Sequence, residues 1–269
     1  MITNRPRRGT ASEAMPRTRC NDGGVPTIAE LLTDLDDATA ALLRDLDGLT
    51  DHDAREKSLL PGWSRGHVLT HLARNAEGGT RLLIWARTGE PGYEYPSVAA
   101  RAQAIEDGAG RPAQELAEDV QRTATALQQA AAAMPPDAWQ HRVTWTTGQE
   151  TGAGHVPASR LAEVLIHHVD LNHGYRPADW PAGWTAWMLD RAVQGMNDER
   201  HLAPLNAGLY ATDTGREFRL DRPGGTEDAE RISGTEADLL AWLMGRSDGA
   251  TLTRDKPGQL PAPPSIYHT

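Results

Sequence analysis

The chain has 269 residues, a length that allows one large domain or two smaller ones. Its formal net charge of −10 argues against a surface for nucleic acid or for anionic membranes. No apolar run approaches the length of a membrane span and no signal-peptide core is present, so we expect a soluble, cytoplasmic protein.

The N-terminal segment 1–25 is polar, contains Arg, Gly and Pro, and lacks hydrophobic periodicity. We predict that it forms a disordered tail. It contains Cys20, the single cysteine of the chain, which excludes an intrachain disulfide and a cysteine-rich metal site. An exposed thiol is a simpler interpretation of Cys20 than a catalytic nucleophile. Any thiol chemistry would therefore need sulfur from a cofactor.

Four long helices are predicted in the first two thirds of the chain. Thr27 starts the first as an N-cap with Glu30 three residues on, and an apolar stripe follows it. Ser64 caps the second, and Pro112 suits the first turn of the third. The four segments span residues 27–48, 64–86, 112–133 and 157–171. Together they predict an antiparallel four-helix bundle over residues 26–176.

The connections between these helices are less regular. Residues 89–110 read as a loop with one short helical piece around 98–105. Tyr93, Tyr95 and Pro96 in this loop either line a pocket or simply pack over the bundle. Residues 141–147 alternate like a strand or an extended arm, and residues 148–154 form a loop.

After Pro177 the pattern changes to short strands and helices. A helix is predicted over Trp184–Leu202, and Thr214-Gly215 marks the turn of a hairpin. The strands of the hairpin are predicted at residues 208–212 and 217–220. A third strand at 231–233, a helix at 236–244 and a last strand at 250–253 follow. Residues 177–269 thus form an α+β module large enough to have its own small core.

Ionisable side chains interrupt two of the apolar helices. Glu163 and His167 are four residues apart and therefore stand on one helix face, while His168 is rotated away by about 100°. His67 and His71 have the same spacing on the second helix, and His71 points toward the core. An ordinary Glu–His pair on a solvated face would explain the first pair. Inward histidines on two separate helices, one with a glutamate a turn away, make a shared metal site the alternative interpretation.

The candidate ligands are His71, Glu163 and His167, since the chain has no H-E-x-x-H, P-loop, G-x-S-x-G or G-x-G-x-x-G motif. Two histidines and one glutamate leave a fourth metal position open, as in catalytic zinc sites. Asp170, Asn75 and His168 are candidates for orienting the imidazoles.

Three motifs in this order resemble the mycothiol-dependent maleylpyruvate isomerase family, over about residues 26–265. They are GWSRGHVLTHLA at 62–73, E-x-x-x-HHVDL at 163–171 and ADLLAWL-x-GR at 237–246. The resemblance implies a DinB-like four-helix bundle followed by a sterol-carrier-like α+β domain. It also implies a divalent metal, most often Zn²⁺, held by His71, Glu163 and His167. An active-site arginine of the family matches Arg246, which would bind a substrate carboxylate.

The resemblance implies the small thiol mycothiol as cofactor or co-substrate and a small electrophile as substrate. A thiol bound to the metal would lose its proton near neutral pH, and the thiolate would add to the C=C bond of maleylpyruvate. The bond is then single and can rotate, and expulsion of the thiol gives the trans isomer, fumarylpyruvate. Two other functions stay open on this scaffold: a thiol S-transferase and a non-catalytic metal-binding bundle. A metal-dependent amidase is more distant. The sequence leaves the oligomeric state, monomer or homodimer, undetermined.

Overall fold

The computed structural model describes residues 26–199, 203–222 and 229–261. The predicted disordered tail 1–25, its Cys20, and the predicted end of a helix at 200–202 lie outside the described residues. Among the described residues, no helix combines the length and apolar character needed to cross a membrane.

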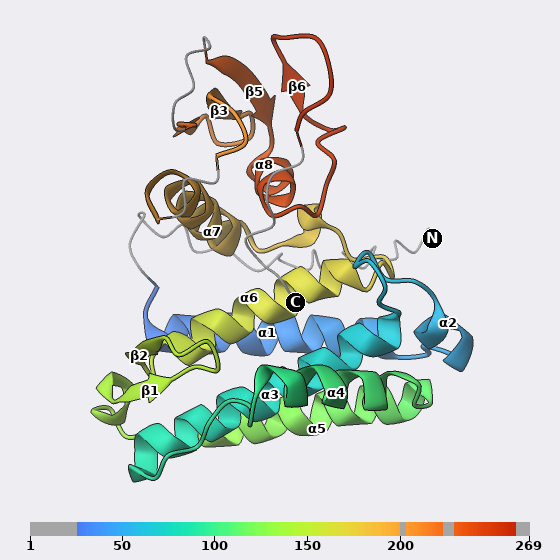
Figure 1. The fold of residues 1–269 in the computed structure, drawn as a ribbon, viewed down its shortest axis with the longest axis vertical. Coiled ribbons are helices and arrows are strands. Elements are labelled where there is room, and N and C mark those ends of the chain that lie inside the picture. Colours follow the sequence, from blue (N-terminus) through green and yellow to red (C-terminus); the bar gives the residue numbers. More distant parts are fainter. Residues whose placement is uncertain (1–25, 200–202, 223–228, 262–269) are drawn as a thin grey trace, which may run out of the picture.

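Four long helices form the predicted bundle, namely α1 (Ile28–Leu46), α3 (Arg65–Thr88), α5 (Ala113–Ala132) and α6 (His155–Asp170) (Figure 1). The side chains of Thr27 and Ser64 accept hydrogen bonds from backbone N–H groups in the first turns of α1 and α3. Helix α3 packs against α5 and α6, while α1 packs against α6 and α5. The bundle and the N-caps Thr27 and Ser64 are therefore confirmed. Pro112 stands at the N-cap of α5 instead of in its first turn, and α6 begins at His155, two residues before the predicted start.

The connections contain more regular structure than predicted. A short helix α2 (Asp51–Arg55) follows α1, and α4 extends over Val98–Ala109. A 3-10 turn η1 (Ala138–Gln140) precedes β1 (Arg142–Thr144). Strand β1 pairs in antiparallel fashion with β2 (Glu150–Gly152), which lies where the sequence predicted only a loop. Strand β1 lies within the segment 141–147 that was predicted to be a strand or an extended arm. The three residues of β2 are too short to give a periodic signal, so its pairing with β1 could not be recognised from the sequence.

The C-terminal part contains two helices and a four-stranded sheet. A 3-10 turn η2 (Pro177–Asp179) leads to α7 (Ala182–Gln194), which continues as a π-helical turn η3 (Gly195–Glu199). The sheet order is β4-β3-β5-β6, with β3 and β5 parallel and the other pairs antiparallel. The bounds are β3 (Ala207–Ala211), β4 (Glu217–Leu220), β5 (Glu230–Gly234), α8 (Glu236–Leu243) and β6 (Thr253–Arg254).

Most of these predictions hold, and one strand was misplaced. The hairpin of β3 and β4 and the helix α8 are confirmed. The last strand was predicted at residues 250–253, but residues 250–251 form a turn and pairing with β5 starts at Thr253. The run Ala-Thr-Leu-Thr has strand-like composition. Its first two residues instead belong to a turn that starts at Asp248, whose carboxylate accepts a hydrogen bond from the Ala250 N–H.

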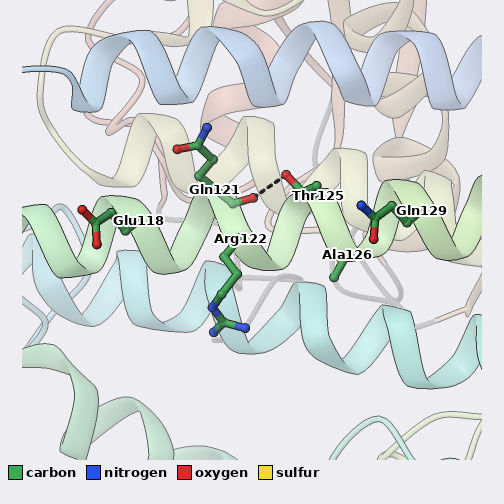
Figure 2. Close-up of a pocket in the computed structure, with 6 residues that line it drawn as sticks. All are labelled: Glu118, Gln121, Arg122, Thr125, Ala126 and Gln129. Atoms are coloured by element: carbon green, nitrogen blue, oxygen red, sulfur yellow. Dashed lines mark hydrogen bonds between the residues drawn. The ribbon is translucent and has the colours of Figure 1, made fainter.

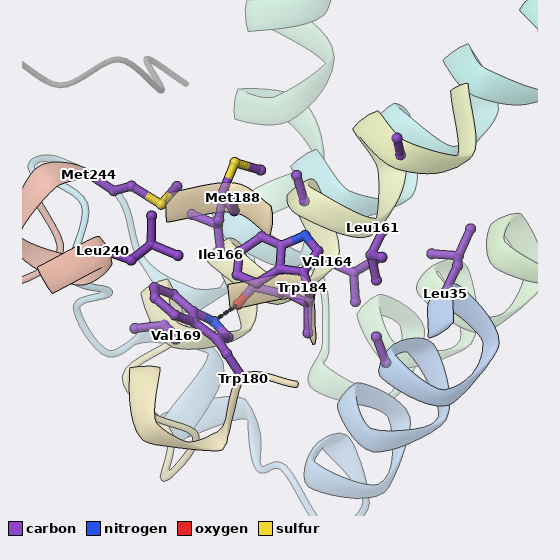
Figure 3. Packing of buried hydrophobic residues seen from close by; sticks show 14 of the residues in the cluster. Leu35, Leu161, Val164, Ile166, Val169, Trp180, Trp184, Met188, Leu240 and Met244 are labelled. Atoms are coloured by element: carbon purple, nitrogen blue, oxygen red, sulfur yellow. Dashed lines mark hydrogen bonds between the residues drawn. The ribbon is translucent and has the colours of Figure 1, made fainter. Parts of the chain in front are cut away.

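Helix α6 connects the two parts of the fold because it is buried on nearly every face. Figure 3 shows its apolar side chains between those of α1 on one side and those of α7 and α8 on the other. The Trp180 indole N–H donates to the Leu165 carbonyl of α6 at 3.0 Å. One continuous apolar cluster includes residues of α1, α6, α7 and α8. The domain boundary at residue 176 stays a prediction, since this shared core spans it.

A shallow surface depression with a volume of about 470 Å³ lies on α5 (Figure 2). All of its lining residues come from that one helix: Glu118, Gln121, Arg122, Thr125, Ala126 and Gln129. The Thr125 hydroxyl bonds back to the Gln121 carbonyl of its own helix. The depression contains none of the predicted ligands, so the candidate site has to be sought elsewhere.

Candidate metal centre

Helices α3 and α6 bring the three predicted ligands together. The Nε2 atom of His71 lies 2.8 Å from Glu163 Oε2, and the Nε2 atom of His167 lies 3.2 Å from the same oxygen. The two imidazole rings meet edge to face with centroids 4.6 Å apart. One ligand atom from each residue falls within 4.8 Å of the other two. Packing of α3 on α6 thus juxtaposes residues that are 92 positions apart.

The cluster is buried on the imidazole side and open on the carboxylate side. The side chains of His71 and His167 are 2% and 7% exposed, whereas Glu163 retains 26% exposure. Trp63 covers His71, with ring centroids 5.8 Å apart. The Glu163 carboxylate is therefore the part of the cluster that contacts solvent.

Burial and mutual contacts set the charges of the cluster. Burial lowers the pKa of His71 to about 4 despite the opposing charge of Glu163, so this imidazole is neutral at pH 7. Burial alone would raise the pKa of Glu163, but the contacts with His71 and His167 hold it well below its usual range. Burial opposes protonation of His167, yet its hydrogen bonds to Asp170 and Glu163 raise its pKa. The surrounding carboxylates thus favour a positive charge at this position.

Asp170 connects the cluster to the C-terminal part. Its Oδ2 accepts a hydrogen bond from His167 Nδ1 at 2.8 Å, which turns Nε2 of that ring toward Glu163. The Arg246 guanidinium, just after α8, donates to both carboxylate oxygens of Asp170 at 3.2 and 2.9 Å. The side chains of Asp170 and Arg246 are 1% and 4% exposed. This buried ion pair joins Arg246 to the candidate ligand through one intervening carboxylate.

Arg101 is a second guanidinium at the cluster, and it was not among the residues predicted from the sequence to belong to the site. It lies on α4, a helix with a weak apolar stripe, and its Nη2 is 3.1 Å from His71 Nδ1. A guanidinium only donates, so Nδ1 acts as the acceptor, which assigns the His71 proton to Nε2. No motif or spacing in α4 signals this contact, because it depends on how α4 packs on α3.

The other histidines that the sequence singled out lie outside the cluster. His67 Nδ1 accepts the Ser64 backbone N–H at 3.1 Å, while its Nε2 faces Glu106. It therefore completes the cap of α3 instead of joining His71. His168 points to the opposite side of α6, where it contacts Asp45 at 2.9 Å and stacks on Tyr175.

Of the three residues predicted to orient the imidazoles, Asp170 alone makes such a contact within the part of the chain that the structure describes. Asn75 lies one turn beyond His71 on α3, but its Oδ1 accepts from Arg160 Nη1 at 2.8 Å. The same Arg160 nitrogen also donates to the Leu72 carbonyl. Asn75 thus links α3 to α6, about one helical turn away from His71.

The donor set fits a divalent cation such as Zn²⁺. Two imidazole nitrogens and one carboxylate oxygen on two packed helices are the ligand types of catalytic zinc sites, which keep a fourth position for an exogenous ligand. The Asp170 contact supplies the supporting carboxylate that metal-binding histidines commonly have. The cluster lacks a protein nucleophile, so a reacting thiol would have to come from solution.

Comparisons with known proteins place the whole fold, including the segment that carries this cluster, beside known structures. The family model described as the mycothiol maleylpyruvate isomerase N-terminal domain matches residues 35–172. A crystal structure of a mycothiol-dependent maleylpyruvate isomerase is 27% identical, with 90% of this chain and 97% of that chain covered and a TM-score of 0.80. A histidine-to-alanine mutant of a mycothiol-dependent maleylpyruvate isomerase gives 26% identity, the same coverage and the same TM-score. No curated protein matches the chain.

Proposed function

The chain belongs to the mycothiol maleylpyruvate isomerase family, and we propose that it is a mycothiol-dependent enzyme that converts maleylpyruvate to fumarylpyruvate. The observation that carries the proposal is the convergence of three ligand atoms within 4.8 Å inside the segment that the family model matches. The structural match extends over 90% of the chain and so includes the C-terminal part. A small thiol as co-substrate is consistent with a cluster that contains no cysteine.

We propose that His71, Glu163 and His167 hold the metal, with Zn²⁺ as the expected ion. When bound, the cation would favour the thiolate form of the small thiol and stabilise negative charge that develops on the substrate. Asp170 would hold His167 in the tautomer that presents Nε2, because Nδ1 donates to its carboxylate.

Arg101 would bind a carboxylate of the substrate. In the structure it donates to His71 Nδ1. An imidazole that gives its Nε2 lone pair to a cation keeps its proton on Nδ1, so Arg101 then loses this acceptor. A substrate carboxylate is the replacement that a guanidinium suits best, since two parallel hydrogen bonds are available. The position next to His71 would bring that carboxylate to the open side of the cluster.

Arg246 would serve the site from the C-terminal part. The sequence predicts that it binds a substrate carboxylate, whereas its contacts with Asp170 support a positioning role through His167. The two roles differ in their response to Arg246→Lys. If Arg246 contacts the substrate, the variant should have a higher KM and normal metal affinity. If Arg246 instead positions His167 through Asp170, metal affinity should fall by about 10–100-fold, as it does when other supporting residues are removed.

The test is turnover of maleylpyruvate with mycothiol by the purified full chain, before and after removal of metal with a chelator and readdition of zinc. We expect fumarylpyruvate, unchanged free thiol and loss of activity without metal. An S-transferase would consume one thiol per product, and a metal-binding bundle without activity would give no product. Absence of conversion by the zinc-loaded protein would reject the proposal. Because the reaction needs a reduced thiol, we expect the enzyme to work in the cytoplasm.

A further inference from the structure

Tyr95 is a buried tyrosine whose hydroxyl has no hydrogen-bond partner. The residue is 7% exposed, and its hydroxyl oxygen is buried without a donor or acceptor of acceptable geometry among the described residues. A buried unpaired hydroxyl is costly, and native structures seldom keep one without a reason. Tyr93, two residues earlier, is 62% exposed, so the loop itself does not force its aromatic side chains inward.

The loop that carries Tyr95 is firmly held against α3. The Arg81 guanidinium donates to the backbone carbonyls of Tyr93 and Glu94. Gly78 permits the close approach, because a Cβ atom at this position would lie 2.7 Å from the Glu94 side chain and 3.1 Å from its carbonyl oxygen. The Glu94 carboxylate accepts the Thr146 backbone N–H at 3.2 Å. These contacts fix the loop on both sides of Glu94 and so place Tyr95 in the interior.

Tyr95 lies beside the metal centre. The Arg101 guanidinium is 5.8 Å from the centroid of its ring, and the same guanidinium contacts His71. Besides burial, the charge of Glu94 raises the pKa of the Tyr95 hydroxyl, Arg101 lowers it through its charge and a side-chain contact, and Glu163 raises it. Tyr95 in turn raises the pKa of Arg160. Arg160 carries another buried donor without a partner among the described residues, its Nη2 atom. Its Nη1 atom donates to the Leu72 carbonyl and to Asn75 Oδ1.

Burial raises the pKa of the Tyr95 hydroxyl, so it keeps its proton at neutral pH and can donate a hydrogen bond to a ligand in the site. An anionic oxygen is the ligand that a protonated hydroxyl and nearby guanidinium groups would share. The proposed reaction creates such an oxygen. When the thiolate forms a C–S bond, the π electrons of the C=C bond move toward the conjugated carbonyl, whose oxygen becomes an enolate. Expulsion of the thiolate returns these electrons, and no proton has to move.

We propose that Tyr95 is a catalytic residue that donates a hydrogen bond from its hydroxyl to the enolate oxygen of the substrate. The inference rests on the function proposed above and adds a residue that neither the motifs nor the comparisons assign. Because the oxygen carries its full charge only after thiol addition, the hydrogen bond should stabilise the transition state more than the bound substrate. Loss of the hydroxyl should therefore lower kcat and leave KM nearly unchanged.

The test is Tyr95→Phe, which removes the hydroxyl and keeps the ring over Arg101. We expect kcat for maleylpyruvate to fall by about 100-fold or more, as for removal of one oxyanion donor, with KM for substrate and thiol within about 3-fold. Bound metal and the melting temperature of the metal-free protein should not decrease, because the hydroxyl makes no well-formed hydrogen bond to any residue that the structure describes. Tyr93→Phe is the matched control on the same loop and should retain full activity.

Three outcomes would overturn the inference. These are a kcat within about 3-fold of wild type, a parallel loss of metal or thermal stability that reveals a structural role, and an equal loss in Tyr93→Phe. Failure of the wild-type enzyme to isomerise maleylpyruvate would reject the proposed function instead. In that event the melting temperatures of the metal-free variants still decide whether the Tyr95 hydroxyl supports the fold, and a destabilised Tyr95→Phe would contradict its proposed placement.

Discussion

The contact of Asp170 with both His167 and Arg246 gives the sharpest test of how the site is built. Asp170→Asn preserves the size of the side chain and removes its charge. His167 would lose a charged acceptor, and the Arg246 guanidinium, 4% exposed, would keep its charge without the opposing carboxylate. Both effects act inside the protein, where water cannot compensate for them.

The expected loss follows from the burial of the ion pair. Removing one partner of a buried pair costs about 3–5 kcal/mol, and the remaining amide oxygen places Asp170→Asn near the lower end, at about 3 kcal/mol. For a chain of this size, that corresponds to a melting temperature lower by roughly 6–12 °C. Zinc affinity should fall by about 10–100-fold, as for other supporting carboxylates of metal-binding histidines.

The assay is thermal unfolding of the metal-free protein together with zinc titration against a competing chelator. Asp45→Asn is the matched control, because Asp45 makes the same kind of contact with His168 on the other side of α6. Its side chain is 43% exposed, so we expect a loss of only about 0–1 kcal/mol and normal zinc affinity. Adding Arg246→Met to Asp170→Asn should restore part of the stability, since a buried guanidinium charge no longer faces a neutral amide in place of the Asp170 carboxylate.

Wild-type stability and zinc affinity in Asp170→Asn would refute the coupling of Arg246 to the metal centre. Equal losses in Asp45→Asn would also contradict it, because they would show a general sensitivity of α6 to carboxylate replacement. A drop in stability at unchanged zinc affinity would leave Asp170 as a structural residue alone.

Three further predictions concern other parts of the chain. His71→Ala should weaken zinc binding by more than the roughly 10–100-fold expected of a supporting residue, since a ligand is lost; full occupancy by elemental analysis would contradict this. Asp119 is 5% exposed, and although burial opposes ionisation, its contacts with Arg111, Arg74 and Arg122 lower its pKa. The stability that it provides is therefore present above the unfolded-state pKa of about 4 and lost as the pH falls below it. Asp119→Asn should cost about 1–2 kcal/mol at pH 7, with solvent screening of the arginines limiting the loss, and the gap to wild type should close in acid denaturation below about pH 4. Cys20→Ser should leave isomerase activity unchanged, and an inactive variant would disprove the use of an external thiol.

The long helices could be predicted because their signals are local. Thr27 and Ser64 are followed by apolar stripes, and both residues cap their helices in the structure. The pair Glu163 and His167 could be placed on one face from its spacing alone. The role of His67 was also within reach, because it stands three residues after Ser64 in the position that Glu or Gln takes in a capping box.

What escaped prediction depends on packing between distant segments. Arg101 meets His71 only because α4 folds back onto α3, and nothing in the local sequence marks this. Arg246 could be predicted to serve the site, but its partner in the structure is Asp170, whose identity requires knowing how α8 docks on α6. The orientation of Tyr95 was equally open, since Tyr93 and Tyr95 have the same chemistry and differ only in burial.

The position of α6 explains why the C-terminal part belongs to the site. The helix presents Glu163 and His167 to α3 on one face and packs its apolar residues against α7 and α8 on another (Figure 3). Arg246 then reaches past the end of α8 to the last residue of α6, Asp170. A bundle without this part would expose both the apolar face of α6 and the buried carboxylate of Asp170. The geometry of His167 therefore depends on docking of the C-terminal part, because the same carboxylate serves both contacts.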